Sequence, residues 1–199
     1  MHGHALQART LLILVSLSCA EPALAHVQQG QAAGFLTGLV HPVSGLDHVL
    51  AMIAVGLWGA QLGKPAMWLL PVTFPLVMAL GGFLGLVGFP LPAVEVGIAV
   101  SALALGLAVA FSARPPLAVA AALVAIFAVF HGHAHGTELP EGESGLTYSM
   151  GFVVATGLLH LVGIVIGLIH RWPSGRVALR VLGAAVAAGG LFFLWRSLA

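Results

Sequence analysis

The stretch GFLTGLVHPVSGLDHVLAMIAVGLWGAQ, residues 34–61, has the length and apolar character of a membrane-spanning helix. Three ionisable side chains interrupt it, at His41, Asp47 and His48. Such groups are tolerated at membrane depth where protein or a water-filled cavity surrounds them. Pro42 removes a backbone donor, so we expect the helix to bend there. The stretch therefore predicts a membrane helix whose break faces a polar interior.

The composition of the whole chain agrees with a membrane location. Of the 199 residues, 60% are hydrophobic and 7% are charged, and the mean hydropathy is +1.08. A soluble domain carries about a quarter charged residues. The net charge of +1 provides no basic surface for nucleic acid, and the single cysteine, Cys19, excludes an internal disulfide. Ten histidines are the unusual feature, because histidine is costly in hydrocarbon unless it has a partner.

The N-terminus has the pattern of a secretory signal peptide. A short apolar run over 11–17 is followed by Pro22 and by the small-residue sequence Ala23-Leu24-Ala25. We expect residues 1–25 to be cleaved; an uncleaved first helix is the alternative.

The remainder, 26–199, predicts a single all-α domain, a polytopic bundle of six transmembrane helices. We expect them over 34–61, 66–87, 93–112, 117–130, 147–169 and 177–195. The fourth is short unless it continues through the histidines that follow it. Glycines such as Gly81, Gly82 and Gly163 suit close helix packing in lipid.

The distribution of charge predicts the orientation. With His26 outside after cleavage, alternation places most basic residues of the mature chain on the cytoplasmic side: Lys64, Arg114, Arg171, Arg176 and Arg180. The acidic loop falls outside, with Glu138, Glu141 and Glu143, and so does Arg196. We therefore expect a multi-pass protein of the inner membrane with a periplasmic mature N-terminus.

The polar residues of the first span form a candidate metal site. His41 and His48 are seven residues apart, which is two turns on one face of a continuous helix. Asp47 offers either an oxygen ligand or an acceptor that fixes an imidazole tautomer. Structural hydrogen bonding is the alternative role for each.

The segment FHGHAHGTE, residues 130–138, is a second candidate. In a helix, His131 and His135 lie one turn apart on one face, a common chelating spacing. His133 points elsewhere, and Glu138 comes within reach if the loop folds back. The alternative is a solvated histidine-rich cap that buffers metal.

Three isolated residues complete the candidate set. Glu95 either serves the N-terminus of its helix or joins the site. His160, in the middle of a span, is a functional candidate or a structural hydrogen-bonding group. His26 would chelate through its α-amino group and imidazole after cleavage. Imidazole with carboxylate suits nickel, cobalt, zinc or copper(II).

Both motifs resemble the signatures of the HupE/UreJ family: the first over HPVSGLDHVLAMIAVGLWGAQLG, residues 41–63, and the second over residues 130–138. The resemblance covers essentially the whole mature chain. It implies a secondary permease for nickel, sometimes cobalt, that supplies the maturation of hydrogenase and urease, with cytoplasmic metallochaperones as partners. It also implies metal handling by six residues: His41, Asp47, His48, His131, His135 and Glu138.

We therefore expect an importer of divalent nickel or cobalt with a site open to the periplasm, with no tightly bound cofactor and no enzymatic activity. One alternative is an intramembrane metal hydrolase, for which Ser44 and Ser149 are available. Another is a metal-sensing or chaperone subunit of a larger transporter.

Overall fold

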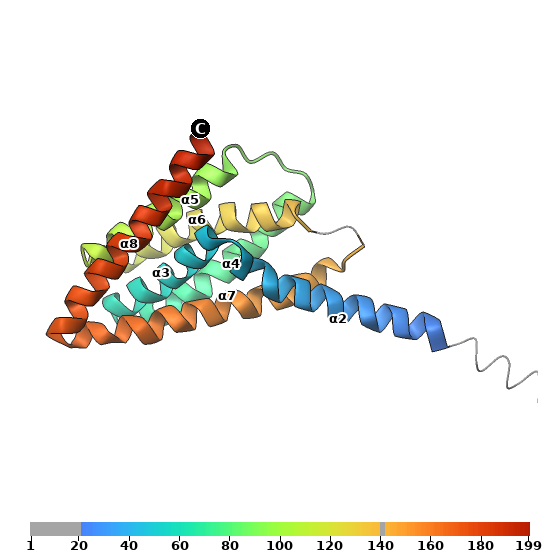
Figure 1. Ribbon diagram of the computed structural model, residues 1–199, viewed down its shortest axis with the longest axis horizontal. Helices are drawn as coiled ribbons and strands as arrows, with labels where there is room; N and C mark the ends of the chain where they lie inside the picture. Colours follow the sequence, from blue (N-terminus) through green and yellow to red (C-terminus); the bar gives the residue numbers. More distant parts are fainter. Residues whose placement is uncertain (1–20, 140–141) are drawn as a thin grey trace, which may run out of the picture.

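The computed structural model describes residues 21–139 and 142–199, with side chains from residue 33 onward. Its helices are α2 (Glu21–Ser44), α3 (Leu46–Leu62), α4 (Ala66–Leu86), α5 (Val94–Ala110), α6 (Leu117–Thr137), α7 (Gly145–Gly167), the short 3₁₀ helix η1 (Leu168–Arg171) and α8 (Pro173–Leu198). No strand occurs in these ranges, so the predicted all-α class is confirmed (Figure 1).

Four helical segments are long and apolar enough to cross a membrane: Ala66–Leu86, Leu117–Thr137, Gly145–Arg171 and Pro173–Leu198. Ala33–Ser44 and Leu46–Leu62 make a fifth span if this pair, bent by 83°, counts as one. α5 is apolar but has only 17 residues. At 1.5 Å per residue it measures about 26 Å, less than the ~30 Å hydrocarbon core. By length, the described residues therefore give four or five spans where the sequence predicted six.

The fourth expected helix is longer than its predicted range of 117–130. α6 continues to Thr137 and carries the second histidine motif in its last two turns. The expected signal peptide falls mostly on residues 1–20, which lie outside the described residues, as does the side chain of His26.

α3 lies at the centre of the bundle and contacts α4, α5, α7 and α8. All its residues from Ala51 to Gln61 are buried except Ile53. The helix ends at Gly63, whose φ of 81° is readily adopted only by glycine. The first turn of this central helix holds Asp47 and His48, so the fold places the first motif among the other helices.

Glycines bring α4 and α6 into backbone contact. A Cβ at Gly132 would meet the carbonyl of Met78, and one at Gly136 would meet the carbonyl of Gly82. Residue numbers rise together along both helices, so the two run in the same direction. The close packing predicted from the small residues is confirmed.

Two further contacts are built in the same way. Against α3, α7 runs in the same direction, because Gly56 faces the carbonyl of His160 while Gly167 packs on Ala60. α5 and α8 run in opposite directions.

Between α5 and α8, Gly106 lies against Ala187 and Gly190 lies against Leu103. All these directions agree with the alternating order of spans that the sequence predicted.

Basic residues gather at one end of the bundle. The indole N–H of Trp58 donates to the carbonyl of Ala113 at 2.9 Å, which brings the α3–α4 and α5–α6 connections together beside Lys64 and Arg114. The end of α7 joins them through the contact of Gly167 with Ala60. The predicted grouping of these charges is confirmed, and both histidine motifs lie toward the opposite end.

Candidate metal centre

The first motif straddles the break between α2 and α3. Pro42 lies inside α2, and the bend falls three residues later, at Gly45, whose φ of −100° and ψ of 113° are extended. The expectation of a bend at Pro42 is therefore wrong: α2 continues through the proline to Ser44, and the chain turns where Gly45 adopts extended backbone. At that end, the Ser44 hydroxyl donates to the carbonyl of His41 at 2.6 Å.

Asp47 orients His48 at the start of α3. Its Oδ1 accepts the backbone N–H of His48 at 2.8 Å and the ring Nδ1–H at 2.9 Å. A carboxylate can only accept, so Nδ1 carries the ring proton and Nε2 carries the lone pair. Asp47 thus acts as the tautomer-fixing acceptor that the sequence offered as one of its two roles.

The second motif presents two histidines inward and one elsewhere, as its spacing predicted. His131 and His135 lie one turn apart on α6 and are 0% and 6% exposed. His133 is turned away, and its Nε2 donates to the carbonyl of Phe89 at 2.7 Å. This bond ties α6 to the α4–α5 connection and leaves His133 outside the site.

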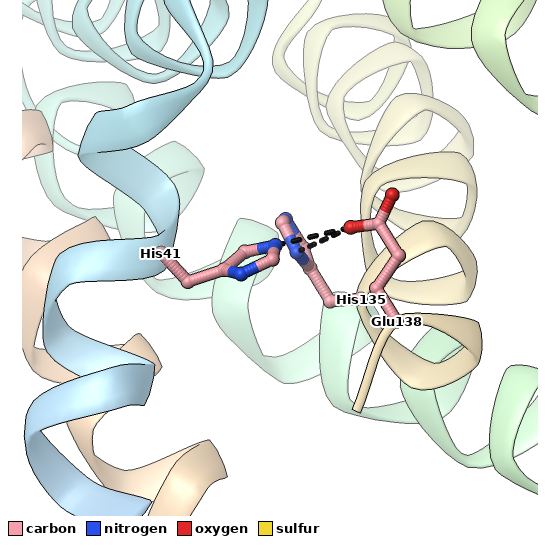
Figure 2. Close-up of side chains that lie close together, drawn as sticks. All are labelled: His41, His135 and Glu138. Atoms are coloured by element: carbon pink, nitrogen blue, oxygen red, sulfur yellow. Dashed lines mark hydrogen bonds and ion pairs between the residues drawn. The ribbon is translucent and has the colours of Figure 1, made fainter. Parts of the chain in front are cut away.

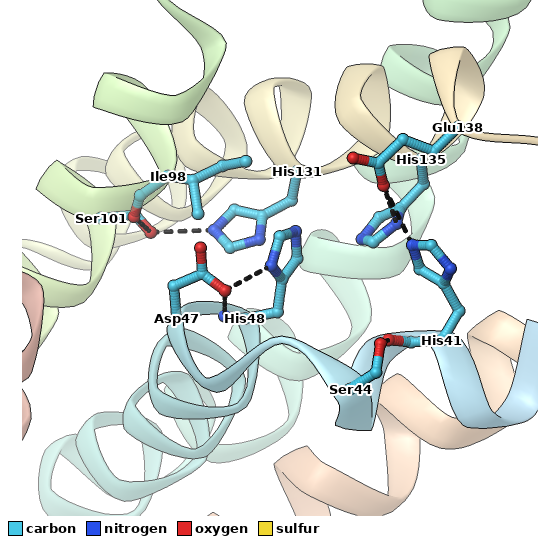
Figure 3. Close-up of polar contacts among 9 residues, drawn as sticks. All are labelled: His41, Ser44, Asp47, His48, Ile98, Ser101, His131, His135 and Glu138. Carbon is cyan, nitrogen blue, oxygen red and sulfur yellow. Dashed lines mark hydrogen bonds and ion pairs between the residues drawn. The ribbon is translucent and has the colours of Figure 1, made fainter. Parts of the chain in front are cut away.

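Ser101 of α5 fixes the tautomer of His131. The Ser101 hydroxyl donates its only proton to the carbonyl of Ile98 at 2.6 Å. Its oxygen therefore accepts the Nε2–H of His131 at 2.8 Å, which leaves the lone pair of His131 on Nδ1. Figure 3 shows both hydrogen-bonded pairs, Ser101–His131 and Asp47–His48, side by side. Sequence reasoning missed Ser101, since a serine in an apolar helix carries no distinctive spacing.

His41, His135 and Glu138 form an outer group at the end of α6 (Figure 2). His41 Nε2 donates to Glu138 Oε2 at 3.0 Å, and His135 Nδ1 lies 3.9 Å from the same oxygen. One ligand atom from each residue falls within 4.8 Å of the others. The hydrogen bond from His41 holds the pKa of the Glu138 carboxyl below its usual value, so the carboxylate stays ionised.

Ring contacts join the outer group to the Asp47–His48 and Ser101–His131 pairs. His135 lies 4.8 Å from His41 and 4.6 Å from His48, measured between ring centroids, and His48 lies 4.7 Å from His131. The four imidazoles thus form one continuous row, and we call them, with Asp47 and Glu138, the histidine cluster. It contains all six residues that the family resemblance implied.

Several cluster nitrogens have free lone pairs in the interior. Among the described residues, His48 Nε2, His131 Nδ1 and both nitrogens of His135 have no hydrogen-bond partner. Buried polar atoms are nearly always partnered, and exceptions need an explanation such as an ion. Neutral imidazole with ionised carboxylate is the donor set that suits divalent first-row metals from cobalt to zinc. The cluster therefore has the chemistry of a metal site.

Of the isolated candidates, Glu95 lies beside the cluster. It occupies the first turn of α5 and shares with Asp47 a cavity of about 310 Å³, lined also by Phe193, Arg196 and Ser197. Glu95 therefore faces the same cavity as Asp47. His160 lies deeper in the bundle, and the side chain of His26 is not described.

A second cavity, of about 140 Å³, flanks His135 between α4, α6 and α7. Its wall is mainly apolar and includes Tyr148 and Ser149. The ring of Tyr148 also lies 5.8 Å from that of His41. Tyr148 is thus a second neighbour of the cluster that the sequence did not single out.

Fold and site together define a polytopic helical membrane protein with a partly buried cluster of histidines and carboxylates. The profile of the HupE / UreJ protein family matches residues 13–193. Over 174 residues the chain is 48% identical to Protein HupE from Rhizobium leguminosarum bv. viciae, covering 87% of this chain and 91% of that protein. The chain therefore belongs to the HupE/UreJ family. No solved structure matches it significantly.

Proposed function

We propose that this protein is a secondary transporter that imports divalent nickel or cobalt across the inner membrane. The observation that carries the proposal is the row of four imidazoles inside a helical membrane bundle, three of which have nitrogens without a hydrogen-bond partner among the described residues. The family resemblance supports nickel or cobalt as the cargo. Imidazole and carboxylate ligands agree with this choice of ion.

The path begins at the outer group. Hydrated Ni²⁺ or Co²⁺ exchanges waters for Glu138 and His41, of which the Glu138 side chain is 51% exposed. The ion then passes along the row to His48 and His131, whose lone pairs are already fixed by Asp47 and Ser101. Binding is moderate at each step, because a site that holds its ion too tightly cannot release it.

The orientation follows from the charges. The end with Lys64 and Arg114 faces the cytoplasm under the positive-inside rule, so the histidine cluster opens to the periplasm. In this proposal residues 1–25 are a cleaved signal peptide and α5 completes six spans. Cytoplasmic metallochaperones of hydrogenase or urease receive the ion.

The test is uptake of radioactive nickel and cobalt into liposomes that hold the purified chain. The native protein should show saturable uptake, and the His41→Ala/His48→Ala variant should show none. His170→Ala is the matched control, since His170 bonds the carbonyl of Gly167 far from the cluster. Absence of flux through the native chain alone would favour a sensor or chaperone subunit.

A metal-dependent intramembrane hydrolase is the second candidate function. The cavity beside His135 favours it, since Ser149 lines that cavity and a substrate would need such access to a metal-bound water. Ser44 is less suited to it, because its hydroxyl is engaged at the end of α2. One zinc retained through purification, together with lipid or peptide cleavage and no uptake, would decide for this candidate.

A further inference from the structure

A second group of polar atoms lies deeper in α7. His160 is 1% exposed, and neither of its ring nitrogens has a hydrogen-bond partner among the described residues. Thr156, one helical turn earlier, is 0% exposed, and its hydroxyl likewise has no partner within the described part of the chain. An imidazole and a hydroxyl without hydrogen-bond partners thus lie on one face of one helix, apart from the histidine cluster.

α4 adds a backbone oxygen to this group. The helix contains Pro71 and Pro75, four residues apart. Because Pro75 has no N–H, the carbonyl of Pro71 loses its usual helical partner. The ring of His160 lies beside this carbonyl. An imidazole and a freed carbonyl thus lie together between α4 and α7, with the Thr156 hydroxyl one helical turn from the imidazole.

Phe74 links this group to the histidine cluster. Its fully buried ring lies 5.3 Å from the ring of His131 and 5.3 Å from that of His160, measured between centroids. His160 is also twelve residues after Tyr148, the neighbour of His41, which is about 18 Å along α7 toward the end that carries the basic residues.

We propose that His160, the Thr156 hydroxyl and the Pro71 carbonyl form a second metal-binding position, which takes Ni²⁺ or Co²⁺ after the histidine cluster. This inference rests on the proposed function. The position has one nitrogen ligand and two neutral oxygens, without a carboxylate, so it holds a divalent ion more weakly than the cluster. A weaker second position favours onward movement, since conduction needs sites from which the ion can leave.

The first measurement is equilibrium binding of Co²⁺ to the purified full chain in detergent, followed by visible absorption. The native chain should bind cobalt in two classes, and His160→Ala should lose the weaker class alone. Thr156→Val, which removes the hydroxyl at nearly constant volume, should weaken the same class. His170→Ala should leave both classes unchanged.

The second measurement is cobalt uptake into liposomes. His160→Ala should reduce the initial rate by about tenfold or more, while the stronger class of cobalt binding persists. If His160→Ala loses both classes of binding, His160→Gln and Thr156→Val decide the question with less change in volume.

If the His160 variants take up cobalt at the native rate and still bind it in two classes, the inference is overturned and the proposed function remains intact. No uptake by the native chain would overturn the proposed function, and the binding measurement would still show whether the second position exists. A single class of cobalt binding in the native chain would also count against it.

Discussion

The rings of His48 and His131 lie 4.7 Å apart at 86° to each other, and each donates its N–H to a different acceptor. His48 donates to Asp47, and His131 donates to Ser101. Their other nitrogens, Nε2 and Nδ1, therefore carry lone pairs before any ion arrives. Outer acceptors of this kind orient metal-binding histidines and make them better ligands.

Replacement of Ser101 tests this arrangement. Ser101→Ala removes the acceptor of His131 Nε2, so the imidazole is free to place its proton on Nδ1 and mask the lone pair. We expect cobalt affinity to fall about 10- to 100-fold, measured by titration of the purified protein. Ser101→Thr keeps a hydroxyl and should restore most of the affinity. Equal losses in both variants would point to packing around α5 instead.

His48 should be indispensable for transport. His48→Ala removes the imidazole that contacts both His131 and His135, which interrupts the row, so uptake in liposomes should fall to background. The amount of protein in the membrane should be unchanged, as measured by immunoblot. Normal uptake by this variant would refute the site assignment.

Replacement of Asp47 should weaken metal binding without abolishing it, in contrast to replacement of His48. Asp47→Asn keeps an oxygen acceptor for His48 but removes the negative charge. We expect cobalt affinity to fall about 10- to 100-fold, as for other outer partners of metal-binding histidines. Unchanged affinity would mean that the carboxylate charge does not support the imidazole.

The sequence predicts which residues form the site more completely than it predicts which of them contact one another. The spacing of His131 and His135 in one helix predicts their shared face, because local periodicity decides it. The partner of His131 could not be predicted, since Ser101 lies on a different helix and reaches the site only through tertiary packing. The contact of Tyr148 with His41 is non-local for the same reason.

Uptake should depend on pH through the imidazoles. Protons compete with the metal for the ring lone pairs, so uptake should fall as the external pH is lowered. Glu138 does not cause this decline, because the hydrogen bond from His41 keeps its pKa below the usual carboxyl value. Initial rates in liposomes at a series of external pH values measure the profile. The acid decline should persist in Glu138→Gln, and its disappearance there would assign the proton to the carboxylate.

The backbone contacts between helices predict a sharp contrast between two glycines of α7. A Cβ at Gly163 would meet the carbonyl of Ile53 on α3, whereas one at Gly157 would meet nothing within 4 Å. Gly163→Ala should therefore destabilise the protein by about 1–3 kcal/mol through overpacking. Gly157→Ala should be neutral or slightly stabilising. Thermal unfolding of both variants in the same detergent measures the difference, and equal stability would contradict the close contact.

The fold shows the same division between local and tertiary information. Hydropathy placed the apolar helices, and the positions of Lys64 and Arg114 gave the grouping of charges at one end. Hydropathy does not predict which helices pack together, such as α5 with α8, because the lipid-facing and helix-facing sides of these helices are both apolar. The location of the bend was also misjudged: Pro42 is the stronger helix breaker, but Gly45 sits where the chain turns.

The turn at Gly45 divides the site between differently packed helices. His131 and His135 belong to α6, which is packed on α4 through backbone contacts at Gly132 and elsewhere. His41 belongs to α2, which packs on α7, where Gly38 lies against the carbonyl of Tyr148 and Gly151 lies against that of Phe35. His48 follows the extended backbone at Gly45 and belongs to the central helix α3. A single break in one apolar stretch thus delivers His41 and His48 to the same site from two separate helix pairs.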